Sequence, residues 1–281
     1  MAITTANGVR LEYEIRGHGE TPLVLVHGSW SSHHTWDLLL PHLAAHFRVL
    51  TYDRRGHGDS ERVSGQGSVR EDVMDLAGLM ENVGFTTAWI VGNSFGASIA
   101  LRFAAERPDL ARGLIVHEPP LFSLLADDPS SARMLEDLDI AGVLECIARG
   151  DHAGGAEQFT EMVVGPGAWS QFPPAVKQMM IENAPTFLDE EQDPETHAFD
   201  PRWIREFSKP VLLTVGDHSS PVFAPLADRL AKALSRGEVL ALEGAGHIPH
   251  VSHPAMWGRS IVDFTSRDSL RPPTLDVISP S

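Results

Sequence analysis

The stretch Gly92-Asn93-Ser94-Phe95-Gly96 decides the fold because of what stands on either side of it. The apolar run Ala88–Val91 comes directly before it, and the helix-like run Ala97–Ala105 follows it. A serine between a strand and a helix is held on a sharp, strained turn that exposes its hydroxyl, and small flanking residues leave room for that turn. The two glycines supply this room. The stretch therefore predicts a nucleophilic Ser94, with a plain tight turn as the alternative interpretation.

Short apolar runs recur along the chain and predict strands. They lack the alternation of apolar and polar residues that a half-exposed strand shows, so we expect strands buried on both faces, as in a parallel sheet. The runs are Leu23–Val26, Arg48–Tyr52, Trp89–Val91, Gly113–Val116, Pro210–Val215 and Glu238–Leu242. Asn7-Gly8, between the runs Ala2–Ala6 and Val9–Ile15, predicts a two-residue hairpin and hence an antiparallel start to the sheet.

Helices are expected between most of these strands. One of them should end at Gly84, because apolar residues recur before it at helical spacing. Its apolar positions are Val69, Val73, Leu76, Met80 and Val83. The run Ala224–Leu234 has a similar pattern. Strands that alternate with helices in this way predict an α/β fold with a doubly wound, mostly parallel sheet.

The alternation stops between residues 119 and 203. This segment is helical and apolar in places, is interrupted by prolines, and lies between two predicted strands. Ligands of open α/β sheets bind at the carboxyl ends of the strands, so we expect a helical cap over that edge. A structural insertion that faces elsewhere is the alternative. Residues 1–118 and 204–269 would then form the core, and residues 270–281 are expected to be a disordered tail.

The composition argues against several classes of partner. The chain has 38 acidic and 22 basic residues, a formal charge of −16 that repels nucleic acids and anionic membranes. No stretch approaches the ~18 apolar residues of a membrane span, and no signal-peptide pattern is visible. Cys146 is the one cysteine, which fits a reducing cytoplasm. We expect a cytoplasmic protein with a neutral or apolar small-molecule substrate, and a homodimer is compatible with the sequence.

Two further stretches place reactive groups at the same edge of the sheet as Ser94. His27-Gly28-Ser29-Trp30 ends a predicted strand, and the backbone N–H groups of Ser29 and Phe95 would form an oxyanion hole. A plain strand-ending turn is the alternative. Gly244-Ala245-Gly246-His247 follows the last predicted strand, which makes His247 the expected general base.

A metal site is a weaker interpretation of the histidines. His247, His250 and His253 are spaced three apart, but prolines interrupt the helix that would align them, and the chain lacks a His-Glu-x-x-His motif. We expect no metal and no cofactor, because acyl-transfer chemistry needs only protein groups and water. His33 and His34 are expected to be solvated loop or helix-start residues.

On these stretches the chain resembles serine members of the α/β-hydrolase superfamily over essentially its whole length. The matching stretches are His27-Gly28, Asp53–Ser60, the Ser94 turn and Gly246-His247, and the serine precedes the histidine as in that family. The resemblance implies the fold and a serine hydrolase, but it is weakly specific for the substrate. In that family the stretch equivalent to Asp53–Ser60 is mainly a structural loop, so no catalytic role is expected for it.

The resemblance leaves two candidates for the acid that orients the histidine. Most members carry it in a Gly-x-x-Asp stretch, where this chain has Gly216-Asp217-His218-Ser219, with serine at the usual position and Asp217 two residues early. Haloalkane dehalogenases and zearalenone lactonases take the acid from an earlier strand end, here His117-Glu118-Pro119-Pro120. The lactonases also resemble this chain in a Thr-Val-Gly strand end and in a stretch like His247–Pro254. Glu118 is therefore favoured over Asp217.

The reaction expected from these groups is acyl transfer. Epoxide hydrolases and haloalkane dehalogenases need a carboxylate where this chain has Ser94. Ser94 would attack a carbonyl, His247 would take its proton, Glu118 would orient the imidazole, and water would release the acyl group. The expected substrate is a carboxylic ester or lactone with an apolar body under the cap. Candidate lining residues, which could equally belong to the core, are Trp30, Phe95, Leu121, Phe122, Trp169, Phe172 and Phe187.

Two other functions remain open. The turn Gly-Asn-Ser-Phe-Gly resembles that of meta-cleavage product hydrolases, which cleave a carbon–carbon bond beside a ketone. Those enzymes resemble the main family in placing their acid at the position that Ser219 holds here. The second is a ligand receptor built on a hydrolase scaffold, with little turnover.

Overall fold

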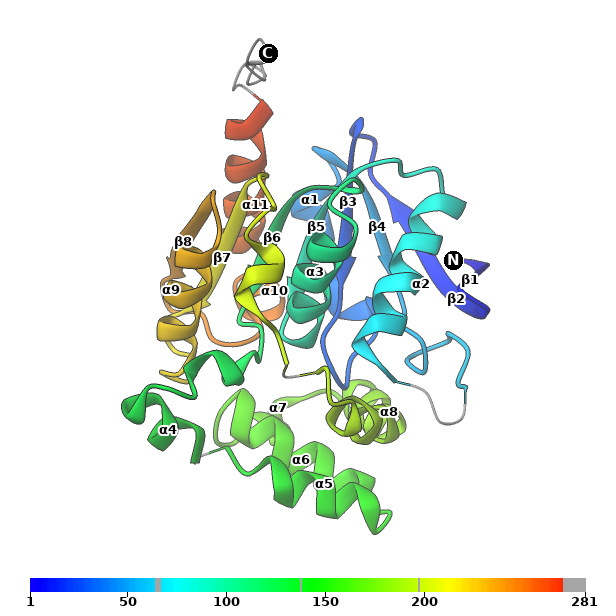
Figure 1. Ribbon diagram of the computed structural model, residues 1–281. Helices are drawn as coiled ribbons and strands as arrows, with labels where there is room; N and C mark the ends of the chain where they lie inside the picture. Colours follow the sequence, from blue (N-terminus) through cyan, green and yellow to red (C-terminus); the bar gives the residue numbers. More distant parts are fainter. Residues whose placement is uncertain (64–66, 137, 197, 270–281) are drawn as a thin grey trace.

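A single eight-stranded sheet organises the protein (Figure 1). The computed structural model describes residues 1–63, 67–136, 138–196 and 198–269, so the expected tail lies outside the described residues. The strand order is β1-β2-β4-β3-β5-β6-β7-β8, in which the pairs β1–β2 and β2–β4 are antiparallel and the other pairs are parallel. The strands are β1 (Ala2–Ala6), β2 (Val9–Arg16), β3 (Thr21–Val26), β4 (Phe47–Tyr52), β5 (Ala88–Asn93), β6 (Ala111–His117), β7 (Val211–Gly216) and β8 (Gly237–Leu242). The predicted doubly wound, mostly parallel sheet is confirmed.

The first hairpin forms where the sequence predicts it. Asn7 and Gly8 connect β1 to β2 with φ values of 47° and 82°, the left-handed conformations that a two-residue hairpin turn requires. Asparagine and glycine tolerate these angles better than other residues.

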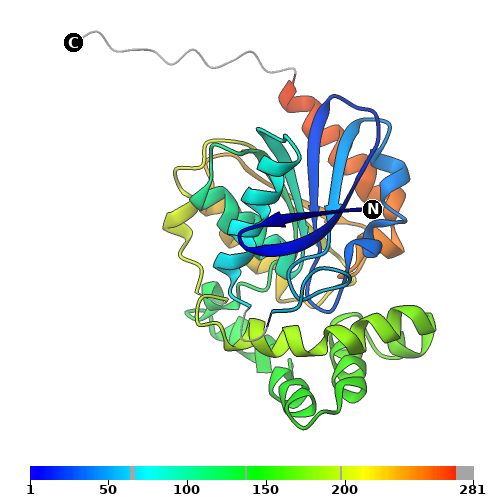
Figure 2. The same ribbon diagram turned by 90° about the vertical axis from the view of Figure 1, so that its right-hand side faces the viewer.

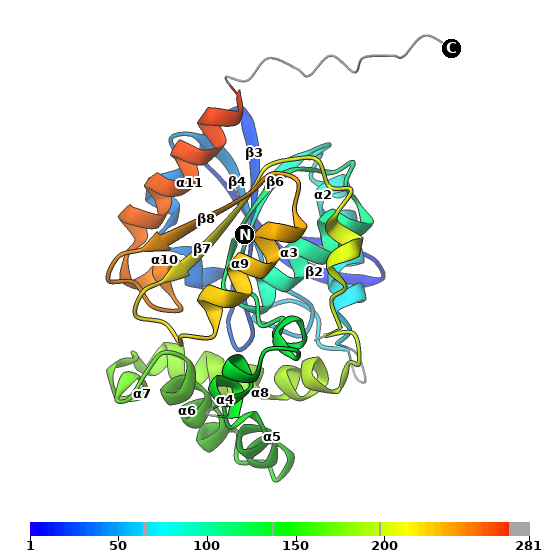
Figure 3. The same cartoon turned by 60° about the vertical axis from the view of Figure 1, so that its left-hand side comes forward.

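Helices cover both faces of the sheet (Figure 3). On one face lie α2 (Val69–Asn82), α3 (Phe95–Glu106) and α9 (Phe223–Ala233), and on the other lie α1 (Leu40–Leu43) and α11 (Pro254–Ser269). The remaining short helices of the core are η1 (His33–Trp36), η3 (Pro201–Ile204) and α10 (Pro249–Ser252). In the described part of the chain, no helix is both long and apolar enough to cross a membrane.

Local signals explain the limits of α2. Ser68 caps its first turn by accepting a hydrogen bond from the backbone N–H of Glu71, whose side chain accepts one from the N–H of Ser68 in return. This reciprocal capping box satisfies N–H groups that the helix itself leaves without partners. Gly84 follows the helix with φ 74°, and the chain leaves the helix at that point as predicted.

The strands at the centre of the sheet are buried on both faces. In β3, Val24 and Val26 pack with α2 and α3, whereas Leu23 and Leu25 pack with α1 and α11. All four side chains are fully buried. This two-sided burial is why the strands read as continuous apolar runs rather than alternating ones.

A helical insertion connects β6 to β7 and lies beyond the carboxyl ends of the parallel strands (Figures 1 and 2). It consists of η2 (Phe122–Leu125), α4 (Pro129–Glu136), α5 (Ile140–Ala148), α6 (His152–Val163), α7 (Ala168–Gln171) and α8 (Pro174–Gln192). The insertion has a small apolar cluster of its own, which includes Val143, Ile147 and Phe187. Trp30, from the loop after β3, also belongs to this cluster and so links the insertion to the core.

Candidate active site

Ser94 stands on the turn between β5 and α3. Its φ of 55° is unusual for a residue other than glycine, and such backbone strain is found preferentially at functional sites. The Ser94 N–H donates a 2.9 Å hydrogen bond to the His117 carbonyl, which ties the turn to the end of β6. A side chain at Gly96 would collide with the carbonyl of Val26, so only glycine allows α3 to begin this close to β3.

Glu118 and His247 form a buried hydrogen-bonded pair at the same edge. The Nδ1 of His247 lies 2.6 Å from Oε2 of Glu118, and Oε1 of Glu118 accepts a 2.8 Å hydrogen bond from the Gly216 N–H. Asn93 at the end of β5 donates a 2.8 Å hydrogen bond to the carbonyl of His247. Since Nδ1 donates to the carboxylate, Nε2 of His247 is the nitrogen left to accept a proton.

Asp217, the other acid candidate, points elsewhere. It is exposed, and its carboxylate accepts a 2.7 Å hydrogen bond from the backbone N–H of Gly244. Ser219 lies in the same turn, and its N–H donates to the carbonyl of Gly216. The geometry therefore pairs His247 with Glu118 rather than with Asp217.

The surroundings of Glu118 favour its ionised form. Burial alone would raise the pKa of this carboxyl group, but its interaction with His117, which becomes charged at low pH, and its hydrogen bond and electrostatic interaction with His247 outweigh burial and lower the pKa. His117 lies 3.5 Å from Glu118 and bonds Thr214 through Nδ1 at 2.9 Å. Burial lowers the pKa of His117 to about 4, so this imidazole is neutral at pH 7. The pair facing His247 is thus a carboxylate and a neutral imidazole.

Two backbone N–H groups lie beside Ser94. Phe95 is the first residue of α3, so its N–H is one of those that no carbonyl of the same helix satisfies. Ser29 follows Gly28, whose backbone passes so close that a Cβ there would lie 3.1 Å from the Ser94 Cβ. Ser29, Phe95 and Ser94 all line one cavity. The two residues whose N–H groups the sequence predicts as an oxyanion hole therefore line the same cavity as Ser94.

The side chain of Ser29 contacts a buried cluster of ionisable residues that the sequence did not predict, formed by Arg54, Asp72 and Glu190. Ser29 Oγ donates a 2.5 Å hydrogen bond to Glu190 on α8, and Arg54 donates a 2.8 Å bond to the other oxygen of that carboxylate. Arg54 also pairs with Asp72 at 2.9 Å. Burial raises the pKa of Glu190 to about 7 despite its contact with Arg54. Glu190 stands in the acidic run Asp189-Glu190-Glu191, a pattern typical of a solvated helix face.

Two cavities meet at Ser94 and His247. Chamber A, of about 360 Å³, is lined by these two residues and by apolar side chains that include Phe122, Leu135, Ile140, Phe187 and Phe223. Chamber B, of about 340 Å³, is lined by the same two residues and by apolar side chains that include Trp30, Leu38, Phe172, Val176 and Met179. Each volume falls in the range of about 300–1,000 Å³ that is usual for small-molecule sites.

A model of the alpha/beta hydrolase family matches residues 23–257 of the chain. The chain belongs to the α/β hydrolase family. Among solved structures, the fold is similar to that of an alpha/beta hydrolase from Sphaerobacter thermophilus. The TM-score is 0.77 and the sequence identity is 25%, and the match covers 94% of this chain and 100% of that chain. This protein is therefore an enzyme of the hydrolase class.

Two curated relatives match this α/β hydrolase over nearly its full length. It is 26% identical to a zearalenone hydrolase from Bionectria ochroleuca, covering 94% of this chain and 97% of the relative. It is also 26% identical to a 2-hydroxymuconate semialdehyde hydrolase from Pseudomonas, covering 92% of this chain and 91% of the relative. A match of 36% identity to a soluble epoxide hydrolase from Corynebacterium is confined to 39% of this chain and 38% of that protein.

The cavities of this hydrolase contain some of the predicted lining residues and not others. Phe122, together with Phe95 and Phe187, lines chamber A, and Trp30 and Phe172 line chamber B. Leu121 and Trp169 are not among the residues that line either chamber. Leu121 is buried in the core cluster beside the sheet, and the Trp169 ring packs against the Lys177 ammonium at 5.3 Å. Apolar character alone did not separate lining residues from packing residues.

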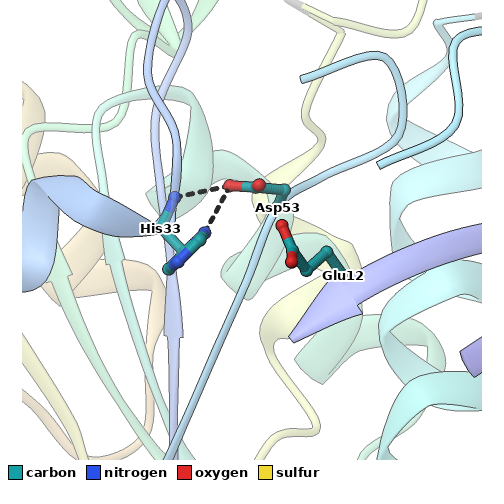
Figure 4. A group of neighbouring side chains, drawn as sticks. All are labelled: Glu12, His33 and Asp53. Carbon is teal, nitrogen blue, oxygen red and sulfur yellow. Dashed lines mark hydrogen bonds and ion pairs between the residues drawn. The ribbon is translucent and has the colours of Figure 1, made fainter. Parts of the chain in front are cut away.

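Three buried side chains away from the two chambers have the residue types of a metal site. They are Glu12, His33 and Asp53 (Figure 4). Their ligand-type atoms lie within 4.8 Å of one another, the one such group in the described residues. One oxygen of Asp53 accepts bonds from the N–H of His33 at 2.7 Å and from its Nδ1 at 2.9 Å, and the other accepts from the N–H of Asp59 at 3.0 Å. Protein donors already occupy these oxygens, so the group serves to hold η1 against the loop after β4.

This group also corrects one prediction. His33 was expected to be solvated, but it is buried because it pairs with Asp53, whereas His34 is exposed as expected. The other clustered histidines have separate partners. His250 is buried against Thr35, with 2.9 Å between Nε2 and Oγ1, and Nδ1 of His253 lies 2.9 Å from the hydroxyl oxygen of Ser252.

Proposed function

We propose that the enzyme is a serine hydrolase that cleaves a carboxylic ester or lactone of a largely apolar small molecule through an acyl-enzyme. The observation that carries this proposal is the 2.6 Å contact between Glu118 and His247, with His247 and Ser94 lining the same cavities. A nucleophile, a base and an acid that orients the base are the groups that acyl transfer needs.

The mechanism has two halves. In the first, Ser94 Oγ attacks the carbonyl carbon while Nε2 of His247 takes the hydroxyl proton, and the N–H groups of Ser29 and Phe95 stabilise the oxyanion. The bond from carbon to the alkoxy oxygen then breaks, and His247 returns the proton to the departing alcohol. In the second half, water repeats the attack on the acyl-enzyme with His247 as base, which releases the acid and restores Ser94. Glu118 keeps the imidazole in the correct tautomer and stabilises its charged form throughout.

The helical insertion acts in this proposal as a cap. Residues from α6 and α8 contribute to both chambers together with residues of the core, and Ile140 of α5 contributes to chamber A. Enclosure by these apolar helices would hold an apolar substrate and limit the access of water to the oxyanion. The zearalenone hydrolase relative, matched over 94% of this chain, supports an ester or lactone as substrate class.

Cleavage of a carbon–carbon bond beside a ketone is the second candidate, which the full-length match to the 2-hydroxymuconate semialdehyde hydrolase favours. The position of the acid argues against it, since Glu118 contacts His247 and the usual position holds Ser219. Epoxide opening is less favoured still, because the turn carries a serine where that chemistry needs a carboxylate.

The experiment that tests the proposal is intact-protein mass spectrometry after incubation with a fluorophosphonate, on wild type and Ser94→Ala side by side. A single adduct on the wild type alone, followed by multiple turnover of esters or lactones, supports the proposal. Turnover of a ketone substrate alone would support the second candidate. A lasting covalent product after one slow turnover would instead support a receptor.

A further inference from the structure

The two chambers meet at the reacting atoms rather than lying one behind the other. Ser94 and His247 line both chambers, and so do Phe159 and Val163 of α6. A molecule whose carbonyl carbon lies at Ser94 therefore has space on two sides of that carbon. Since the chambers measure about 360 and 340 Å³, neither is a minor extension of the other.

Phe159 lines both chambers and contacts an aromatic ring from each of them. Its ring stacks on Trp30, which lines chamber B, at 5.2 Å between ring centres and 25° between planes. The same ring contacts Phe187, which lines chamber A, edge to face at 5.1 Å. Aromatic pairs in these geometries attract each other beyond simple area burial, so the Phe159 ring is held in place from both sides.

Both linings are mostly apolar, although chamber B also has polar lining residues, among them the exposed His34. Among the described residues, neither chamber is lined by a lysine or arginine, and Glu191 is the one acidic residue, in chamber A. His250 lines chamber B, where burial lowers its pKa to about 3, so it is neutral at pH 7. A carboxylate in either chamber would lose part of its hydration without gaining a lysine or arginine as a partner.

The exposed lining residues of chamber B include two apolar side chains beside the polar His34. Leu38 and Val251 line this chamber, and their side chains remain exposed to solvent at 55% and 39%. Such exposed apolar side chains at the rim of a cavity are typical of a path by which an apolar ligand enters.

We propose that the substrate is an uncharged ester with an apolar group on each side of the scissile bond, and that its acyl and alcohol groups occupy different chambers, divided by Phe159. This inference rests on the proposed ester hydrolysis and names its substrate class. An ester with one short side, or a small-ring lactone whose two sides are tied together, fills one chamber and leaves the other to water.

Two ester series test this assignment in the wild-type enzyme. Ethyl esters of acids with two, four and six carbons vary the acyl group, and acetates of alcohols with two, four and six carbons vary the alcohol. We expect kcat/KM to rise in both series by roughly tenfold for every two methylenes, because each buried methylene contributes about equally. Monoethyl adipate, which carries a carboxylate, should be cleaved at least a hundredfold more slowly than ethyl hexanoate.

Two variants assign the chambers. Ile140→Trp fills part of chamber A, and Val176→Trp fills part of chamber B. One variant should lower kcat/KM for the longest ester of one series at least tenfold and change kcat/KM for the other series by less than threefold. The second variant should affect the other series in the same way and spare the first. Met74→Trp, on the exposed side of α2, is the control and should leave both series unchanged. Ile140→Phe and Val176→Phe make the same test with less added volume if a tryptophan variant does not fold.

The outcomes separate this inference from the function on which it rests. Turnover of esters with both variants affecting the same series, or with only one series rising with length in the wild type, overturns the two-chamber assignment and leaves ester hydrolysis intact. Preference for monoethyl adipate overturns the uncharged substrate. No turnover of any ester by a wild-type enzyme whose unfolding is cooperative overturns the proposed function and this inference together.

Discussion

The hydroxyl of Ser29 donates a 2.5 Å hydrogen bond to the carboxylate of Glu190, 161 residues further along the chain. Ser29 belongs to the loop beside Ser94, and Glu190 belongs to α8 of the helical insertion. One buried contact therefore joins the insertion to the proposed oxyanion hole. Because Arg54 bonds the other oxygen of the same side chain, the position of the loop depends on a carboxyl group that the insertion supplies.

We expect Glu190→Gln to lower kcat by about tenfold to a hundredfold while KM changes by less than threefold. An amide has one acceptor oxygen, so it cannot accept hydrogen bonds from both Ser29 and Arg54 on separate oxygens, and the loop loses part of its position. Oxyanion contacts act mainly in the transition state, so the loss should appear in kcat. Steady-state kinetics with an ester that the wild type hydrolyses measures both constants.

A double-mutant cycle with Ser29→Ala separates this role from a general loss of stability. If the two side chains act through their mutual hydrogen bond, the double variant should lose little more than Glu190→Gln alone. Glu182→Gln, on the exposed side of the same helix, is the matched control and should leave kcat unchanged. Fully additive losses, or a rise in KM alone, would contradict a positioning role for Glu190.

The acid of the proposed triad can be tested by an isosteric pair. We expect Glu118→Gln to lower kcat by about 10⁴-fold, since an amide in place of the acid favours the wrong tautomer of the histidine. Asp217→Asn should remain within threefold of wild type, because Asp217 is exposed and bonds the backbone of Gly244 instead. Comparison of kcat for the two variants is the measurement. The reverse ranking would assign the acid to Asp217.

The central strands of the sheet could be predicted from the sequence because they are buried on both faces. The strand β8 was expected to be buried too, but it lies at the edge of the sheet and is exposed from Glu238 to Ala241. Each of the six apolar runs lies in a strand of the structure, apart from the one-residue overhang of Pro210 before β7. Two-sided burial leaves a continuous apolar signal, and the capped helices between the strands have their own local signals. These features depend on neighbours in the chain, which is why the sequence carries them.

Which residue serves as the acid beside His247 depends on the direction in which its side chain leaves the end of a strand, and not on its residue type. Glu118 has a φ of 49°, a left-handed conformation at the end of β6, and its carboxylate lies on His247. Asp217, at the end of the adjacent strand, turns to solvent. The sequence predicted both as candidates, but no local pattern states which way a side chain leaves a strand end.

The buried charges could not be predicted for a similar reason. Glu190 is buried because Arg54, 136 residues away in the chain, and Ser29 meet it. His33 is buried because its imidazole pairs with the carboxylate of Asp53. A titratable residue is buried or solvated according to partners that the fold brings together, and these partners have no fixed spacing in the sequence.

The strain at Ser94 predicts the relative stability of two inactive variants. Alanine keeps the cost of a positive φ, whereas glycine adopts φ 55° without it, so Ser94→Gly should be more stable than Ser94→Ala by about 1–2 kcal/mol. Urea unfolding measures this difference. Ser98, in the middle of α3, is the matched control, because there glycine should be less stable than alanine by about 1 kcal/mol. Equal stabilities at position 94 would mean that the turn is not strained in solution.

The buried neutral histidines predict how stability depends on pH. Burial lowers the pKa of His250 to about 3, so between pH 6.5 and 3 the unfolded chain binds a proton there that the folded protein does not. The free energy of unfolding therefore falls as the pH falls, by up to about 1.4 kcal/mol per pH unit for each such group. His27 and His117, with pKa values lowered to about 3 and about 4, act in the same direction. Glu190 acts in the opposite direction, since a pKa raised to about 7 keeps a proton on the folded state.

A single substitution isolates one of these protons. In His250→Gln the amide can still reach Thr35, but the side chain no longer titrates. We expect the wild type to lose stability more steeply than this variant between pH 6 and 4, by a slope equivalent to one proton, because the contributions of all other groups cancel in the comparison. Urea unfolding at several pH values in this range gives both slopes. Parallel slopes would mean that His250 takes up its proton in the folded state, and that the cluster around Trp36 and Trp257 admits a charge.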